Sequence, residues 1–84
     1  MAVLDEVKEI LVSELGVKPE MVTLEAKLRE DLGADSLDRA EAVSVLEERF
    51  EISITDEDVT KVVSVRDIVE LVTQKLQAKS VSSS

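Results

Sequence analysis

The sequence predicts an all-α fold, a four-helix bundle whose third helix is short and whose first two helices are joined by a long loop. Three observations support this prediction. Apolar residues recur every three or four positions in three segments of the chain. Glycine, proline and capping residues stand near the ends of those segments. No alternation of apolar and polar residues is long enough for a strand.

The first helix is expected over residues 3–15, because its apolar residues keep helical spacing and Gly16 follows as a stop signal. Residues 16–35 then form a long connection that contains Pro19 and Gly33. A loop of this length needs apolar residues that attach it to the core. The candidates for that role are Val17, Met21, Val22, Leu24, Leu28 and Leu32.

The second helix is expected over residues 36–50, with either Asp35 or Ser36 as its N-cap. Two stripes of residues run along it at the same helical spacing. One stripe is apolar apart from its first member and should face the bundle: Arg39, Ala42, Val43, Leu46 and Phe50. The other should face solvent: Leu37, Ala40, Glu41, Ser44 and Glu48, with Glu47 beside it. Leu37 is thereby left as a large apolar side chain among carboxylates.

Two further helices complete the bundle. A short third helix is expected over about residues 55–61, and Ser64 can cap a fourth helix that continues to about Gln77. The chain therefore forms one domain, residues 1–78. The tail, residues 79–84, has no core-forming pattern and is expected to be disordered.

Composition excludes several classes of function. The 84 residues include no cysteine and no histidine, so the chain has no disulfide, thiol nucleophile, imidazole base or ordinary zinc site. An enzyme and a metal centre are therefore not expected. No secretory signal precedes the domain and no apolar run is long enough to cross a membrane, so the expected location is cytoplasmic.

The net charge of −9 is concentrated in residues 30–58. That segment holds eleven acidic and two basic residues, while acids and bases cancel in the rest of the chain. Such a field repels nucleic acid and anionic lipid and attracts basic protein surfaces. We therefore expect partners with basic docking surfaces, no nucleic-acid partner and no insertion into a membrane.

Three segments resemble motifs of one protein family. Residues 31–38, DLGADSLD, resemble the signature of acyl carrier proteins, here of the stand-alone bacterial type II kind. Residues 46–50 (LEERF) and 54–58 (ITDED) resemble two further segments of that family, and the resemblance extends over residues 3–76. It implies that a phosphopantetheinyl transferase attaches 4′-phosphopantetheine covalently to Ser36. The arm's thiol would then carry acyl intermediates of fatty acid biosynthesis as thioesters, on a monomeric carrier.

The resemblance also implies roles for residues around Ser36. Asp35 and Leu37 would lie beside the prosthetic group, and Asp35 with Asp38 would engage the transferase. Acyl-chain synthesis enzymes would dock on residues of the second helix, namely Leu37, Asp38, Glu41, Glu47 and Glu48. The acyl chain would lie in a pocket formed by Arg39, Ala42 and Leu46.

Three positions depart from the family's usual residues. Arg39 replaces a small residue, Ala42 a leucine and Thr55 a proline. An arginine on the inward stripe needs a partner or access to water. In one interpretation Arg39 keeps its head in water and pairs with Asp35 one turn away. In the other, it lies at the mouth of the pocket and favours an unusual or polar acyl group.

Other functions remain open at this point. The departures are also compatible with a specialised carrier for polyketide or modified-lipid assembly. A different class is an unmodified acidic protein-interaction bundle in which Ser36 is only a helix cap. Weak binding of divalent cations by the acids between Asp31 and Asp58 is compatible with either class.

Overall fold

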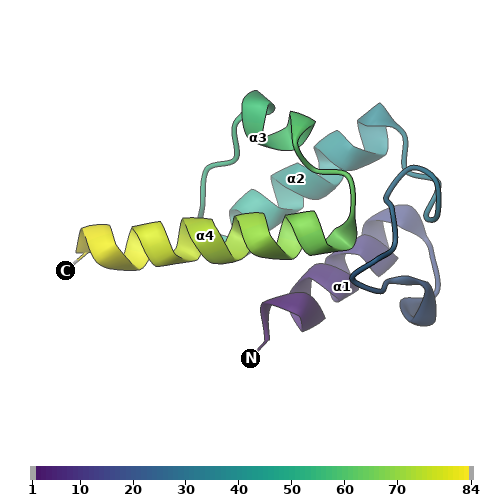
Figure 1. Ribbon diagram of the computed structural model, residues 1–84, viewed down its shortest axis with the longest axis horizontal. Coiled ribbons are helices and arrows are strands. Elements are labelled where there is room, and N and C mark those ends of the chain that lie inside the picture. The colour runs from purple at the N-terminus through teal and green to yellow at the C-terminus, as the bar shows by residue number, and fades with distance from the viewer. Residues whose placement is uncertain (1, 84) are drawn as a thin grey trace.

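The structure is a computed structural model that describes residues 2–83, with side chains as far as residue 79. Its four α-helices are α1 (Val3–Leu15), α2 (Ser36–Phe50), α3 (Asp56–Thr60) and α4 (Val65–Ser83), and a 3₁₀ turn, η1 (Pro19–Met21), follows α1 (Figure 1). Within residues 2–83 the only strand-like pairing is one isolated bridge. The predicted all-α class, short third helix and long first loop are confirmed.

The helices are arranged around α1. This helix packs against both α2 and α4, and α2 and α4 also contact each other. Figure 1 shows the short α3 on the connection that runs from the end of α2 to the start of α4. The first loop, drawn in dark blue, crosses the end of the molecule where α2 begins.

Local signals account for the ends of α1 and α2, which agree with the predicted bounds. Gly16 ends α1 with a positive φ of 68° and donates its N–H to the Val12 carbonyl at 3.0 Å. Glu51 ends α2 with a φ of 55°, which is unusual for a residue with a side chain. Lys79 of α4 helps to hold this turn, because its Nζ lies 3.0 Å from the Glu51 carbonyl oxygen.

The long loop is attached to the core by side chains and by backbone hydrogen bonds. Val22, Leu28 and Leu32 are buried as expected. Met21 was also expected to anchor the loop, but it belongs to the η1 turn, which has no buried residue, and its side chain is 43 % exposed. The Leu28 N–H donates to the Val63 carbonyl at 3.0 Å, which fastens the loop to the start of α4.

The start of α4 is stabilised by a carboxylate. Asp67 Oδ2 accepts hydrogen bonds from the backbone N–H groups of Val63 at 2.9 Å and Ser64 at 3.0 Å. These two bonds, the one from Val63 first, lower the pKa of Asp67. Ser64 Oγ in turn accepts from the Asp67 N–H at 3.4 Å, so the predicted cap is present.

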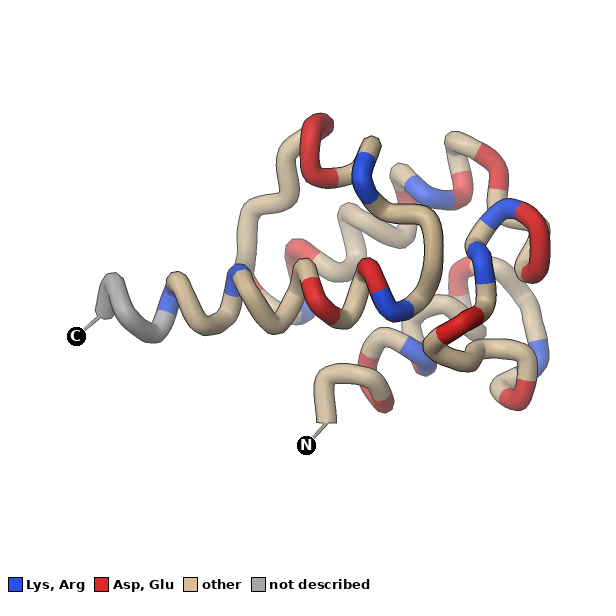
Figure 2. Tube along the Cα trace, in the orientation of Figure 1, with Lys and Arg blue, Asp and Glu red and all other residues tan. Residues whose placement is uncertain are grey.

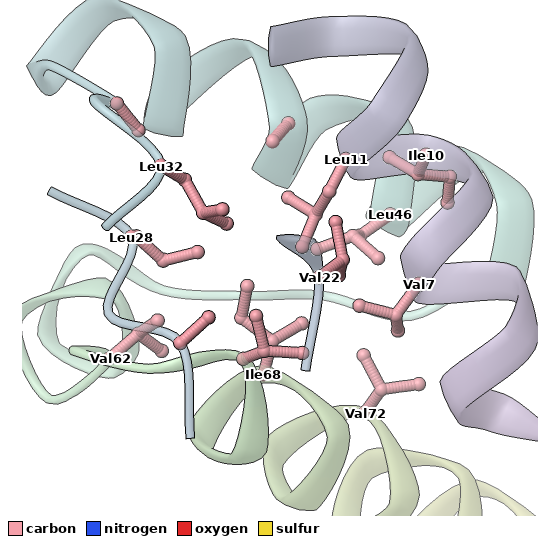
Figure 3. Close-up of a cluster of buried hydrophobic side chains, with 14 of the residues drawn as sticks. Val7, Ile10, Leu11, Val22, Leu28, Leu32, Leu46, Val62, Ile68 and Val72 are labelled. Atoms are coloured by element: carbon pink, nitrogen blue, oxygen red, sulfur yellow. The ribbon is translucent and has the colours of Figure 1, made fainter. Parts of the chain in front are cut away.

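One hydrophobic core joins the helices and the loop. Figure 3 shows apolar side chains from α1, the loop, α2 and α4 converging on one another. Those with less than 2 % exposure are Val7, Leu11, Leu46, Val65 and Val72. Aliphatic residues fill this core, and Phe50, the one aromatic residue of the chain, closes it at the end of α2. In residues 2–83 no helix has the length and apolar character required to cross a membrane.

The predicted end of the fourth helix, near Gln77, is wrong. α4 continues to Ser83, and Lys79 Nζ donates to the carbonyl oxygens of Phe50 at 3.4 Å and Glu51 at 3.0 Å. A lysine that binds carbonyls at another helix's C-terminus stabilises both ends together. Residues 79–83 of the expected tail are thus helical in this structure, while residue 84 lies outside the described part. That the tail is disordered in solution, with a domain boundary at residue 78, stays a prediction.

Candidate functional site

Ser36 is the first residue of α2, and it is exposed. The N-cap is Asp35: its Oδ1 accepts from the Asp38 N–H at 2.8 Å, and Asp38 Oδ2 accepts from the Asp35 N–H at 3.3 Å. This reciprocal capping box means that Ser36 is not needed as a cap. Within residues 2–83 the Ser36 hydroxyl makes no hydrogen bond, so it is open to a modifying enzyme.

The chain before Ser36 is fixed in place. Gly33 adopts a φ of 70°, and no atom lies within 4 Å of where its Cβ would be, so the backbone angle is what favours glycine there. Ala34 is 2 % exposed, and its N–H donates to the Leu28 carbonyl at 2.8 Å. The start of α2 is therefore anchored to the core while Ser36 projects from it.

The first backbone N–H groups of α2 are suited to a phosphate. Those of Asp38 and Arg39 are bonded to Asp35, whereas those of Ser36 and Leu37 donate to no acceptor in the described chain. Open N–H groups at a helix start carry the positive end of the helix dipole and favour anions. The residues present thus fit a phosphate ester on the Ser36 hydroxyl.

The two faces of α2 lie as predicted. Ala42, Leu46 and Phe50 of the inward stripe are buried. The outward stripe is exposed: Leu37, Ala40, Glu41, Ser44 and Glu48. Leu37 is 68 % exposed, the largest value among the exposed large apolar side chains of the described residues. Figure 2 shows acidic residues, in red, along α2 and at the start of α3.

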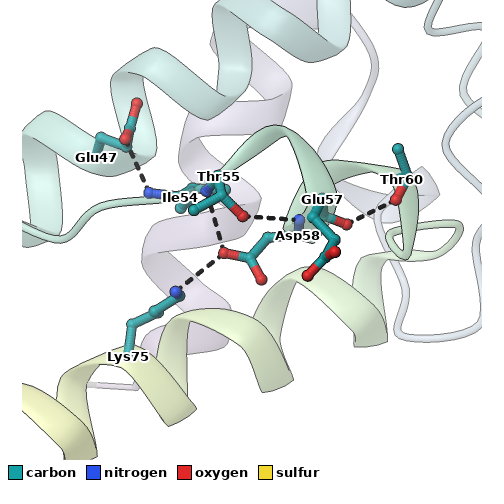
Figure 4. A network of polar contacts seen from close by, with 7 residues as sticks. All are labelled: Glu47, Ile54, Thr55, Glu57, Asp58, Thr60 and Lys75. Carbon is teal, nitrogen blue, oxygen red and sulfur yellow. Dashed lines mark hydrogen bonds and ion pairs between the residues drawn. The ribbon is translucent and has the colours of Figure 1, made fainter.

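Two of the predicted docking acids have partners of their own. Asp38 is half-buried and belongs to the capping box. Glu47 Oε2 accepts a hydrogen bond from the backbone N–H of Ile54 at 2.8 Å, in a half-buried position (Figure 4). Glu47 thus holds the connection between α2 and α3. The sequence carries no signal for this contact, because it depends on the path of the connection.

A narrow cavity of about 20 Å³ lies beside α2. Arg39, Ala42 and Leu46, the predicted pocket residues, all line it. The wall opposite α2 comes from residues that the sequence analysis did not predict as pocket residues, among them Ile54, Val59, Val62, Leu71 and Val72. Helical spacing marked some of these as core residues, but only the packing of α3 and α4 brings them to the cavity. A space of this size holds about one water molecule.

Arg39 does not make the ion pair considered for it. Its guanidinium has no carboxylate partner within the described residues, and Asp35 is engaged in the capping box instead. The expected pairing of Arg39 with Asp35 is therefore wrong in this structure. Arg39 is half-buried and lines the cavity in the first turn of α2.

A polar network holds α3 in place opposite α2 (Figure 4). Thr55 caps α3: its Oγ1 accepts from the Asp58 N–H at 3.0 Å, and its own N–H donates to Asp58 Oδ2 at 3.1 Å. A proline at this position would lack the N–H that makes the second bond. Lys75 Nζ of α4 lies 2.9 Å from Asp58 Oδ2. The hydrogen bond from Lys75 and then those of Thr55 lower the pKa of Asp58 to about 2.

No metal centre is formed by the part of the chain that the structure describes. Residues 2–83 contain no group of three or more acidic side chains arranged to hold a metal ion, and the sequence has no histidine or cysteine. In the described residues, the candidate site consists of the exposed Ser36, the acidic outward face of α2 and the narrow apolar cavity behind that helix.

Comparison with known proteins identifies a family for this combination. Residues 5–72 match the model of a family described as a phosphopantetheine attachment site. The chain is 50 % identical over 72 residues to the acyl carrier protein of Campylobacter fetus, a match that covers 86 % of this chain and 94 % of the relative. It is also 50 % identical over 72 residues to the acyl carrier protein of Wolinella succinogenes, covering 86 % and 95 % respectively.

The fold gives the same result. The crystal structure of the acyl carrier protein from Thermotoga maritima superposes with a TM-score of 0.77 at 32 % sequence identity, covering 88 % of this chain and 86 % of that one. The relatives share a name that describes a carrier rather than an enzyme, and the family model describes attachment of a phosphopantetheine group. Sequence, fold and site thus agree, and the chain belongs to the acyl carrier protein family.

Proposed function

We propose that this protein carries acyl intermediates of fatty acid biosynthesis as thioesters, on a 4′-phosphopantetheine arm attached to Ser36. The observation that supports this site most directly is the exposed Ser36 hydroxyl, which makes no hydrogen bond in the described chain. When bound, the group supplies a thiol, which the chain itself lacks because it has no cysteine.

The chain's own residues prepare the attachment point. Ser36 Oγ would become one ester oxygen of the phosphodiester, and the open N–H groups of Ser36 and Leu37 would face its negative charge. The capping box of Asp35 and Asp38 fixes the first turn of α2, so the attachment point is held by backbone rather than by a flexible loop.

Partner enzymes would dock on the exposed face of α2. Leu37 offers apolar contact, while the exposed Glu41 and Glu48 attract basic surfaces and raise the rate of encounter. Asp38 would also lie within reach of a transferase bound at Ser36. Glu47 contributes charge to the same field, but its hydrogen bond to Ile54 gives it a structural role as well.

The growing acyl chain would enter the cavity between α2 and the α3–α4 pair. Since the cavity holds about one water molecule, the helices must separate for a chain to fit. Burying the chain against Leu46 and its aliphatic neighbours removes apolar surface from water and offsets part of that cost. The protein would act as a monomer, because the exposed large apolar residues of its described part, Met21, Leu37 and Val63, are too few for a dimer core. The cytoplasm is its proposed location.

Intact mass spectrometry tests the attachment. The purified protein is incubated with coenzyme A and a phosphopantetheinyl transferase of broad specificity. We expect a gain of one arm in the wild type and none in Ser36→Ala. The matched control is Ser44→Ala, which removes an exposed serine from the same helix and should be modified like the wild type. Absence of any gain with several transferases would favour the unmodified interaction bundle instead.

A further inference from the structure

The narrow cavity beside α2 and a groove on the surface of the protein share part of their lining. The cavity has a volume of about 20 Å³. The groove, of about 520 Å³, lies between α3 and α4, the two helices that the Asp58–Lys75 pair joins (Figure 4). Val62 and Leu71 line both the cavity and the groove. At each of these two positions a single residue therefore separates the cavity from the groove.

Leu71 is the more movable of these two residues. Val62 is buried, with 9 % exposure, and its branched Cβ restricts the rotamers that its side chain can adopt. Leu71 is only half-buried, and both of its side-chain torsions can move between staggered rotamers while the backbone stays in place. A change of rotamer at Leu71 would therefore open a passage from the cavity to the groove.

The groove is suited to the end of a hydrocarbon chain. Its apolar residues, Val62, Val69 and Leu71, are buried or half-buried. The exposed residues of its lining are all polar, namely Lys61, Glu70, Gln74 and Gln77. A hydrocarbon that lies against the apolar residues removes their surface and its own from water, while the exposed polar side chains stay hydrated.

The length of the chain decides whether its end lies in the cavity or in the groove. The cavity holds about one water molecule, so each added methylene group must push apart the close-packed side chains around it. A chain tethered at Ser36 keeps its thioester end at the entrance, and its distal end advances as the chain grows. Once the cavity is filled, the passage beside Leu71 leads the distal carbons into space that is already open.

We propose that the groove between α3 and α4 binds the distal carbons of long acyl chains, which reach it past Leu71, whereas short chains end in the cavity. The groove is then a second binding site for the same tethered chain, and Leu71 sets the chain length at which this site is reached. This inference rests on the proposed attachment at Ser36, since the tether fixes which end of the chain advances.

Nuclear Overhauser contacts of the chain terminus test the inference in the wild-type protein. The protein is loaded enzymatically with saturated arms from hexanoyl to hexadecanoyl, each labelled with ¹³C at the terminal methyl group, and intact mass confirms the loading. We expect the hexanoyl methyl group to contact Leu46 and Val72, which line only the cavity. The hexadecanoyl methyl group should lose these contacts and gain contacts with Val69 and Thr73, which line only the groove.

The outcomes separate this inference from the carrier function. A hexadecanoyl methyl group that contacts cavity residues alone would overturn the inference and leave the carrier function intact. Failure to load any arm would overturn the attachment itself, and the inference with it.

Two leucines of α4 provide a matched pair of variants. Leu71→Ala removes a side chain between the cavity and the groove, so contacts with Val69 and Thr73 should appear at a shorter chain length than in the wild type. Leu76→Ala removes a leucine that is also half-buried but lines neither the cavity nor the groove, and it should keep the wild-type length. The same length in Leu71→Ala and in the wild type would reject the passage beside Leu71. If Leu71→Ala fails to fold, the wild-type series still decides whether the groove binds the chain.

Discussion

Glu47 and Glu48 are neighbours in the sequence with different surroundings. The Glu47 carboxylate accepts the Ile54 N–H at 2.8 Å, whereas the Glu48 carboxylate is exposed and has no hydrogen bond or ion pair in the described chain. A half-buried N–H that loses its acceptor costs about 1–3 kcal/mol. One acid therefore supports the fold, and the other is available to a partner.

Alanine substitutions distinguish the two acids. We expect Glu47→Ala to lower the free energy of unfolding by about 1–2 kcal/mol, because the Ile54 N–H loses its acceptor. Glu48→Ala should change it by less than about 0.5 kcal/mol, as is usual for an exposed site. Urea denaturation measures both values, and affinity for a transferase should fall in Glu48→Ala. Equal losses of stability in the two variants would contradict the structural role of Glu47.

Helix α3 depends on its attachments to the rest of the fold. It has five residues, too few to be stable alone, and it contributes Val59 to the cavity wall. Thr55 and Asp58 close its first turn, and Lys75 joins it to α4. The Asp58–Lys75 pair joins α3 to α4, so it would oppose a separation of these two helices.

The pH dependence of stability tests this attachment. Asp58 has a pKa of about 2 in the folded protein, below its ordinary 3.8, because of Lys75 and Thr55. A lowered folded-state pKa contributes stability that is present above the ordinary value and is lost as the pH falls through about 2. We therefore expect Tm to fall between about pH 5 and pH 2, and less steeply in Asp58→Asn. Glu57→Gln, a neighbour outside the ion pair, should keep the wild-type slope.

The elements that the sequence predicts well are those with local signals. Gly16 ends α1, and Asp35 with Asp38 begins α2, each through contacts within four residues. The end of α4 was missed because Lys79 binds carbonyls 28 and 29 residues away.

At the site, the motif around Ser36 located the attachment point. The lack of an ion pair between Arg39 and Asp35 was not predictable. The Asp35 carboxylate can either pair with an arginine or cap the helix, and only the folded geometry shows that it caps the helix.

Across the whole molecule, the acids outnumber the partners available to them. The chain has nineteen acidic and ten basic residues, and the acids concentrate on residues 30–58. Arg49 of α2 pairs with acids on α1, and Lys75 of α4 pairs with an acid on α3. The exposed carboxylates of Glu41 and Glu48 on α2 have no partner in the described chain. The face proposed to attract enzymes is therefore also a source of repulsion within the folded protein.

Salt should relieve this repulsion. Raising NaCl from about 0.01 M to about 1 M shortens the Debye length from about 30 Å to about 3 Å, so we expect Tm to rise. The double variant Glu41→Gln/Glu48→Gln should melt higher than the wild type at low salt and respond less to added salt. Its control, Glu20→Gln/Glu70→Gln, removes two exposed acids outside residues 30–58 and should change Tm less. A Tm that stays constant across ionic strength, or equal shifts in the two double variants, would mean that the acidic segment does not limit stability.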